Sequence, residues 1–164
     1  MAEVINPRGL ALAELRALRG KLQNDDDVVS YVRRLAQARL DLVQAEKRRR
    51  LDGGTESLSD ELPSILSTHL TGGPPRPPRP AEDFSNHQLA DQLEALSDRA
   101  SDRDLSSLSE EELVTYADAL HEFEQARSHE RRELFARIDE LSAELVRRYR
   151  DGEADVDGLL AADD

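Results

Sequence analysis

The chain has very little of what builds a compact globular core. Among its 164 residues there is no cysteine, no tryptophan and one methionine, and aromatic residues make up only 4 %. The lack of cysteine excludes disulfide bonds and thiolate metal sites. The scarcity of bulky apolar residues argues against a deep three-dimensional core. The abundance of Ala, Leu, Glu, Arg and Asp favours long helices that bury one apolar seam.

Long apolar runs are missing as well. The N-terminal residues contain no apolar core of a signal sequence, and no stretch approaches the roughly 20 apolar residues of a membrane-spanning helix. We therefore expect a cytoplasmic protein that makes no membrane contact.

The charge balance is strongly acidic. Asp and Glu number 35 against 22 Lys and Arg, so the formal net charge is −13. Such a chain repels nucleic acid as a whole, and we expect no direct DNA binding. The acidity suits a protein partner with a basic face, although acidity that serves only solubility is more common.

Apolar residues that recur at three- and four-residue steps predict helices in the first third of the chain. A short helix is expected over 10–22. The run Asn24–Asp27 interrupts the pattern and can cap a second helix, which ends in the basic run 47–50 before Gly53. We interpret that basic run as a helix C-terminus rather than as a phosphate-binding patch.

The middle of the chain has another character. An amphipathic stretch over 57–70 contains Pro63, a Gly- and Pro-rich linker covers 72–80, and a weak helix is expected over 85–98. The proline-rich segment is interpreted as a linker rather than as a proline-recognition site. The leucines of the two amphipathic stretches either contact a partner or cover the long helices, and the residues leave both interpretations open.

The last third predicts one long helix. Ser109 and Glu112 form a capping-box pattern, and leucines at seven-residue intervals continue to Leu141. About forty residues at ~1.5 Å each give a helix of about 60 Å. The fold class is therefore all-α: an antiparallel hairpin or coiled coil of two long helices with short accessory helices. The predicted segments are a short N-terminal helix (1–24), a first motif-bearing helix (25–50), a linker region (51–108), a second motif-bearing helix (109–151) and an acidic tail (152–164).

Two stripes of polar residues share one spacing. On each long helix, five residues separated by 4, 3, 4 and 4 positions fall on one helical face. An isolated polar stripe is usually a solvated face, but here acid, Ser, Arg and Asp recur in the same order. The first stripe is expected to face away from the apolar seam. The two stripes are Asp26, Ser30, Arg33, Gln37 and Asp41 on the first helix, and Glu124, Ser128, Arg131, Phe135 and Asp139 on the last.

An antiparallel pairing would bring the two stripes together. If Asp26 is opposite Asp139 and Asp41 is opposite Glu124, both pairs of residue numbers add to 165 and the stripes are level. Guanidinium groups suit the O6 and N7 acceptors of guanine, carboxylates suit its N1–H and N2–H₂ donors, and hydroxyls suit phosphates. A cyclic guanine dinucleotide offers all of these groups, although the chemistry alone does not single it out.

The repeated spacing acid-x₃-Ser-x₂-Arg-x₃-Gln-x₃-Asp resembles the RsiG-like family of anti-sigma factors from actinobacteria. The string from Asp27 to Leu35 is also similar to that family. The resemblance implies that both motifs bind a dimer of cyclic di-GMP, and that the loaded protein holds a WhiG-like sigma factor and represses sporulation genes. The family motif has Glu where Asp26 stands and Gln where Phe135 stands, so Phe135 is a candidate for stacking rather than hydrogen bonding. The ligand residues implied by position are Asp26, Ser30, Arg33, Gln37, Asp41, Glu124, Ser128, Arg131 and Asp139.

Two other classes of protein remain as alternatives. A structural or adaptor coiled coil would carry the same stripes as solvated faces and would bind no nucleotide. An enzyme is the weakest alternative, because the chain has no Gly-rich phosphate loop and its four histidines lack metal-ligand spacing. We expect no catalytic residue and no bound metal.

Overall fold

A computed structural model describes residues 6–53, 84–98 and 104–152 of the chain. The described residues form helices and contain no strand, which confirms the predicted all-α class. The segments expected over 57–70 and 72–80, and residues 153–164 of the acidic tail, lie outside the described residues. The elements are η1 (Pro7–Gly9), α1 (Leu12–Leu51), α3 (Gln88–Asp98), η2 (Leu105–Ser107) and α4 (Glu110–Arg150).

The first long helix has no break. The interruption predicted at Asn24–Asp27 is absent, and α1 continues through these four residues. Leu15 lies fully buried before them, and Val28 and Val32 are buried after them. Because the apolar seam continues on both sides, tertiary packing outweighs the low helix propensity of Asn and Asp at this point.

Local signals set the start of α4 and the C-terminal ends of both long helices as predicted. The Glu112 backbone N–H donates to Ser109 Oγ at 3.2 Å, and the Ser109 N–H donates to Glu112 Oε2 at 2.7 Å, so the capping box is confirmed. Gly53 follows α1 with φ of +89°, and Gly152 follows α4 with φ of +72°. Only glycine adopts this left-handed conformation without steric cost, which ends both helices there.

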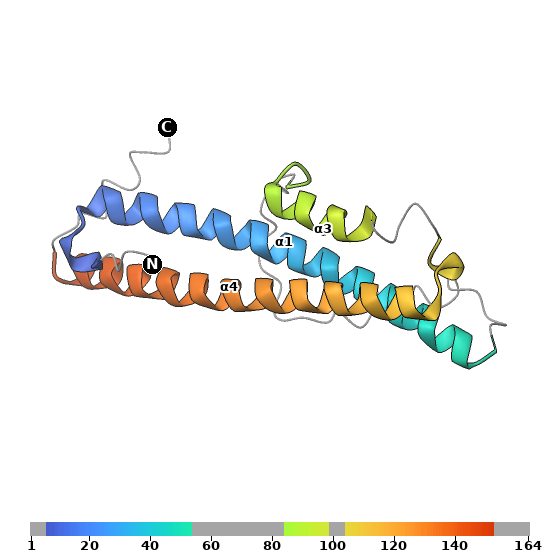
Figure 1. The fold of residues 1–164 in the computed structure, drawn as a ribbon. Helices are drawn as coiled ribbons and strands as arrows, with labels where there is room; N and C mark the ends of the chain where they lie inside the picture. Colours follow the sequence, from blue (N-terminus) through green and yellow to red (C-terminus); the bar gives the residue numbers. More distant parts are fainter. Residues whose placement is uncertain (1–5, 54–83, 99–103, 153–164) are drawn as a thin grey trace, which may run out of the picture. The chain divides into compact units, whose positions relative to one another are not determined.

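The chain folds as two compact units. Unit 1 contains Met1–Asp27 and Glu130–Asp164, and unit 2 contains Val28–His129. Each unit therefore holds one part of α1 and one part of α4. Within each unit these two helical stretches run antiparallel and side by side (Figure 1).

Leucines form the core of unit 1. Leu15, Leu141 and Leu145 are buried and bring the N-terminal part of α1 against the C-terminal part of α4. Leu18 and Leu22 pack against this cluster and are only partly buried. At one side of the core, the Arg16 guanidinium donates to the Tyr149 hydroxyl and lies over its ring.

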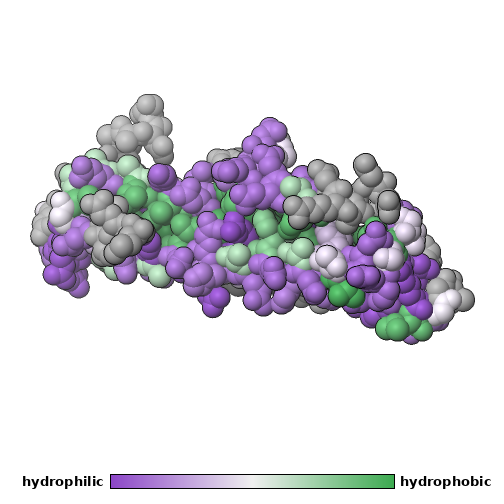
Figure 2. Space-filling model, viewed as in Figure 1, coloured by the Kyte–Doolittle hydropathy of each residue, from purple (hydrophilic) through white to green (hydrophobic). Residues whose placement is uncertain are grey.

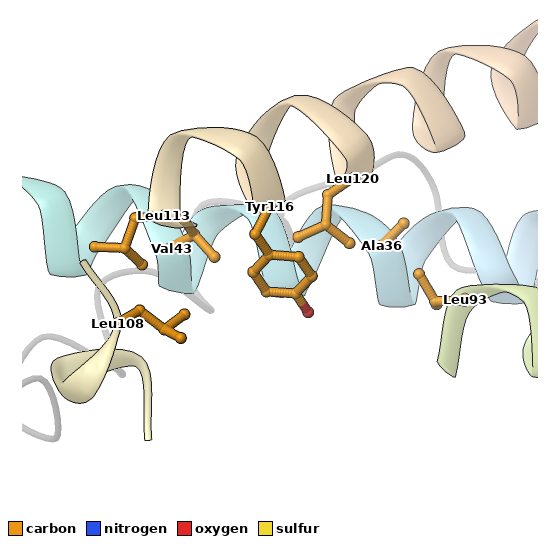
Figure 3. Close-up of a cluster of buried hydrophobic side chains, with 7 residues drawn as sticks. All are labelled: Ala36, Val43, Leu93, Leu108, Leu113, Tyr116 and Leu120. Carbon is orange, nitrogen blue, oxygen red and sulfur yellow. The ribbon is translucent and has the colours of Figure 1, made fainter. Parts of the chain in front are cut away.

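The core of unit 2 has a third helix. Leu93 of α3 has no exposed surface and packs in one cluster with Ala36, Tyr116 and Leu120 (Figure 3). The Arg39 guanidinium of α1 binds α3 at two points. It donates to the Leu93 carbonyl at 3.3 Å and forms an ion pair with Glu94. Leu93 and Leu96 of the stretch expected over 85–98 therefore pack on the long helices of unit 2.

One structural plan occurs twice, at an offset of 98 positions. The 3₁₀ turn η1 precedes α1 as η2 precedes α4, and each pair of elements differs by 98 in its starting residue. Asn6 Oδ1 accepts the N–H of the residue two positions later at 3.1 Å, and Asp104 Oδ1 does the same at 3.3 Å. The repeat thus extends well beyond the two polar motifs.

The plan includes a buried glutamate near the end of each long helix. In unit 2, Glu46 is 1 % exposed and accepts hydrogen bonds from Arg49 and Arg50. Arg50 Nη2 also donates to the carbonyls of Leu105 and Leu108. The two guanidinium groups lower the pKa of Glu46 to about 2. Two arginines of the basic run 47–50 are thereby engaged within the chain.

Unit 1 repeats this arrangement. Glu144 is buried and accepts hydrogen bonds from Arg147 and Arg148, which lower its pKa to about 2. Arg148 Nη2 donates to the carbonyls of Pro7 and Arg8 in η1. In both units a glutamate–arginine cluster therefore fastens the end of one long helix to the 3₁₀ turn before the other.

Candidate functional site

The ten stripe residues lie on α1 and α4, as predicted, but they are less exposed than a solvated face. Nine of them are half-buried and only Asp139 is exposed. The stripes therefore run along the border of the helix–helix contact rather than directly opposite the apolar seam. Unit 1 holds Asp26, Arg131, Phe135 and Asp139, and unit 2 holds Ser30, Arg33, Gln37, Asp41, Glu124 and Ser128.

In unit 2, the arginine of the first motif meets the acid of the second. Arg33 Nη1 donates to Glu124 Oε1 at 3.1 Å and to Gln37 Oε1 at 3.3 Å. Ser128 Oγ donates to the same Glu124 oxygen at 2.8 Å. Four of the predicted site residues thus form one hydrogen-bonded group. The side chains of Arg33 and Glu124 are 23 % and 19 % exposed, so both can still be reached from solvent.

In unit 1, the arginine of the second motif meets the acid of the first. Arg131 Nε lies 3.4 Å from Asp26 Oδ1. The Arg131 guanidinium also lies over the ring of Phe135, 4.5 Å from its centroid. A cation over an aromatic face is attracted by the electron-rich ring. Asp139 is the exposed end of this stripe.

The site residues of the two units make the same contact at the first and third motif positions and a different contact at the fourth. In both units the first-position acid pairs with the third-position arginine of the other motif. At the fourth position, Gln37 accepts a hydrogen bond from its arginine, whereas Phe135 stacks on its arginine. The two arginines are therefore oriented by different kinds of contact.

The register differs from the predicted one. The residue numbers of both acid–arginine pairs add to 157, and not to the 165 expected if Asp26 were opposite Asp139 and Asp41 opposite Glu124. Two facing carboxylates repel each other at short distance, while a carboxylate and a guanidinium attract. The observed register replaces two repulsive contacts with two favourable ones.

The glutamate–arginine clusters at the helix ends were missed by the sequence analysis. The pattern Glu-x₂-Arg-Arg begins at Glu46 and recurs at Glu144, with the same 98-residue offset as the polar motifs. A search for the extent of the internal repeat would have found it.

A cavity lies in unit 2, apart from the stripes. Its volume is about 630 Å³, and it is lined by Leu96 of α3 and by residues of the first turns of α4, including Glu111, Thr115 and Tyr116. No stripe residue lines it. The candidate site is consequently a pair of accessible side-chain groups on helices and not this cavity.

The stripe residues can supply guanidinium donors, carboxylate acceptors and a hydroxyl within a few ångströms. Such a set suits a planar ligand with acceptors on one edge and donors on another. Among residues 6–53, 84–98 and 104–152, no group of three or more His, Cys, Asp or Glu side chains is placed to hold a metal ion. Within the same ranges, no helix combines the length and apolarity needed to cross a membrane.

Comparison with known proteins identifies the family. No curated protein matches the chain. The family model described as RsiG-like matches residues 3–66 and 99–163, which include α1 and α4 with both motifs, whereas residues 84–98 with α3 fall outside the match. Since these two segments make up most of the sequence, the chain belongs to the RsiG-like family.

Proposed function

We propose that this protein is an anti-sigma factor that binds cyclic di-GMP through its two motifs and, once loaded, holds a WhiG-like sigma factor so that sporulation genes stay repressed. Membership in the RsiG-like family suggests an anti-sigma factor of this type. The observation that carries the ligand proposal is the acid–arginine contact that recurs at the same motif positions in both units.

Each acid–arginine group is suited to one guanine-containing ligand. Arg33 is held by Glu124 and Gln37, so its guanidinium is oriented before the ligand arrives. A guanidinium can bind O6 and N7 of guanine as a bidentate donor, and a carboxylate can accept from N1–H and N2–H₂. Glu124 Oε1 already accepts hydrogen bonds from Arg33 and Ser128. A guanine that donates to Glu124 would therefore replace one charge-assisted hydrogen bond of this carboxylate with another.

Unit 1 would bind by a different balance of forces. Arg131 is already stacked on Phe135, and the flat surface of a base can extend such a stack. The side chain of Asp26 is one methylene shorter than the Glu that the family motif has at this position. We therefore expect the group in unit 1 to bind through stacking more than through hydrogen bonds, and with an affinity unlike that of unit 2.

The sigma factor is proposed to bind the loaded form. By thermodynamic linkage, a ligand that raises the affinity for sigma must itself be bound more tightly when sigma is present. The acidic surface outside the stripes can attract a basic face of sigma and so raise the association rate. The mechanism requires no catalytic residue, and none is proposed.

A structural coiled coil is the competing function. Interhelical ion pairs also occur in proteins whose only role is to hold helices together, so ligand binding must decide. The decisive experiment is isothermal titration of cyclic di-GMP into the chain, with and without the candidate sigma factor. We expect about two ligands per chain and tighter binding when sigma is present.

Matched variants make this titration specific. Arg33→Ala and Arg131→Ala should each weaken binding at least about 10-fold, the loss expected when a charge-assisted contact disappears. Arg34→Ala and Arg132→Ala are the controls, because each removes the exposed arginine next to a motif arginine. Unchanged binding in the motif variants, with normal helix content by circular dichroism, would show that the site is elsewhere. No heat for the unaltered chain under either condition would favour the structural coiled coil.

A further inference from the structure

The row of motif charges on α1 continues beyond the first motif, towards the start of the helix. Arg33 pairs with Glu124 of α4. Asp26, which stands one heptad before Arg33, pairs with Arg131. Residues one heptad apart hold the same place in a contact between two long helices. The residue one heptad before Asp26 is Arg19, so the next place in this row is also occupied by a charged side chain.

The observed register places Arg19 level with Asp139 of α4. The residue numbers of both acid–arginine pairs add to 157, so the residue opposite Arg19 is Ile138, and Asp139 follows it directly. The core of unit 1 agrees with this register, because Leu15 and Leu141 pack in one cluster. Arg19 and Asp139 both belong to unit 1. A guanidinium from outside the motifs and the last carboxylate of the second motif therefore stand across from each other.

The side chains of Arg19 and Asp139 form no ion pair or hydrogen bond within the part of the chain that the structure describes. Arg16, three positions before Arg19, is by contrast engaged by the Tyr149 hydroxyl. Arg19 is half-buried, and its Nε atom is buried without a hydrogen-bond partner. A donor that is shielded from water and lacks an acceptor opposes folding. Packing and pairing within unit 1 therefore give no reason for an arginine at position 19.

Comparison of the two units shows that this arginine is specific to unit 1. The residue 98 positions after Arg19 is Ala117, which packs against the core of unit 2. The units also differ at the fourth motif position, where unit 2 has Gln37 and unit 1 has Phe135. Phe135 cannot form a hydrogen bond through its side chain. Unit 1 thus lacks one polar group of the site in unit 2 and has one guanidinium more.

The border of the helix–helix contact suits a long cationic side chain. Figure 2 shows hydrophilic residues next to an apolar strip where the N-terminal part of α1 meets the C-terminal part of α4. An arginine at such a border can bury its methylene groups and keep its charged end at the surface. Of the guanidinium nitrogens of Arg19, only Nε is buried without a partner. The two Nη groups can therefore present parallel N–H donors to a ligand.

We propose that Arg19 and Asp139 form a guanine clamp in unit 1, in which Arg19 donates to O6 and N7 of one guanine and Asp139 accepts from N1–H and N2–H₂ of the same base. Guanine places two acceptors beside two donors, so a guanidinium and a carboxylate that face each other select it. The inference rests on the proposed function, because the clamp holds the cyclic di-GMP that this function names.

The clamp and the motif arginine of unit 1 act on different parts of the ligand. Arg131 is paired with Asp26 and stacked on Phe135. It stands eight positions before Asp139, or about two turns of α4. Arg131 and Phe135 therefore offer a stacking surface for one base, while Arg19 and Asp139 bind the edges of another. Recognition of base edges in unit 1 thus depends on an arginine outside the motif.

Substitution of Arg19 tests the clamp by isothermal titration. Arg19→Met should weaken binding of cyclic di-GMP about 10-fold, the loss expected for a charge-assisted contact. Arg19→Lys keeps the charge without the planar fork and should recover little of this loss. Lys21→Met is the matched control, because it removes an exposed cation on another face of α1. Helix content and melting temperature without ligand should not fall in any of these variants.

Ligand analogues identify the atoms that the clamp contacts. Cyclic dinucleotides of 7-deazaguanine and of hypoxanthine lack N7 and the N2 amino group, respectively, and each should bind the unaltered chain more weakly than cyclic di-GMP. The penalty for the missing N7 should shrink at least about 3-fold in Arg19→Met, as expected when two groups interact directly. The penalty for the missing amino group should shrink likewise in Asp139→Asn. Glu140→Gln, at the exposed neighbouring position, should keep both penalties.

Each result decides between alternatives. Unchanged binding by Arg19→Met, with a loss in Arg33→Ala, overturns the clamp and leaves the proposed function intact. Full recovery by Arg19→Lys, or an undiminished N7 penalty in Arg19→Met, overturns base recognition in favour of a contact with phosphate. A lower melting temperature of Arg19→Met, with both analogue penalties unchanged, overturns it in favour of a packing role. No binding of cyclic di-GMP by the unaltered chain contradicts both proposals.

Discussion

Arg33 Nη1 lies 3.1 Å from Glu124 Oε1, and the two residues are 91 positions apart in the chain. This contact joins the third position of one motif to the first position of the other. Arg131 and Asp26 make the corresponding contact in the other unit at 3.4 Å. The motif residues are therefore partners of one another within the fold, besides being candidates to bind a ligand.

The contact between Arg33 and Glu124 should appear as a measurable coupling. In a double-mutant cycle with Arg33→Ala and Glu124→Ala, we expect a coupling free energy of about 0.5–1 kcal/mol, the range of partly exposed ion pairs. Urea unfolding of the four chains at low ionic strength provides the measurement, and added salt should reduce the coupling. Strict additivity of the two single changes would show that the pair does not persist in solution.

Replacement of Phe135 should make the two ligand groups more alike. Phe135→Gln gives the second motif the residue that the first motif has at its fourth position, Gln37. It also removes the ring under the Arg131 guanidinium. We expect titration of cyclic di-GMP to change from two unequal affinities towards a single one, because both arginines would then be held by an amide oxygen. Gln37→Phe is the reciprocal variant and should make unit 2 resemble unit 1. Identical isotherms for all three chains would exclude a role for this position.

Glu46 should make stability depend on pH. Its pKa is lowered to about 2 by Arg49 and Arg50, from a usual value of 4.5. A group with a depressed pKa in the folded state contributes its stabilisation fully above the unfolded value, and this contribution is lost as the pH falls from about 4.5 to 2. The free energy of unfolding should therefore decrease over that window, and Glu144, with the same depression, adds to the effect.

The variant Glu46→Gln isolates this contribution. It should lower the free energy of unfolding at pH 7 by about 1–2 kcal/mol, because a neutral amide replaces the charge-assisted hydrogen bonds that the carboxylate accepts from two partly exposed arginines. It should also flatten the pH dependence between pH 4.5 and 2 relative to the unaltered chain. Exposed Glu122 offers a control, and Glu122→Gln should leave both stability and its pH profile almost unchanged. An equally steep acid transition in both variants would contradict the assignment.

Leu93 should contribute more to stability than its neighbours on α3. It is fully buried among residues of α1 and α4, so Leu93→Ala removes apolar contacts and leaves a cavity, at a cost of about 3 kcal/mol. Leu89→Ala, at a half-buried position of the same helix, should cost distinctly less. Thermal unfolding followed by circular dichroism compares the two variants. A smaller effect for Leu93 than for Leu89 would show that α3 does not cover unit 2 in solution.

Some features were readable from short stretches of sequence. The start of α4 follows from Ser109 and Glu112, which need only each other and the backbone between them. Its end and that of α1 follow from glycines that accept a positive φ. Leu113, Leu120, Leu134 and Leu141, spaced by multiples of seven, predicted which side of α4 is buried; three of them are buried and Leu134 is partly buried. These signals act within a few turns of one helix, so no tertiary information was needed.

The positions of the candidate site residues were predictable for the same reason, but their partners were not. The 4, 3, 4, 4 spacing places five residues on one face of any helix. Which residue of the other helix lies opposite depends on interactions between segments far apart in the chain. The attraction between Arg33 and Glu124 favours a register other than the one predicted by aligning the two motifs end to end.

The sequence by itself determined an all-helical chain, the start of α4, the C-terminal ends of both long helices, and two polar motifs of equal spacing, because each of these depends on contacts between residues a few positions apart. The tertiary structure alone decided that α1 continues through Asn24–Asp27, that acids pair with arginines across the helices, and that α3 covers unit 2. These features depend on the packing and charge of segments far apart in the chain, whose combined energy outweighs local preference.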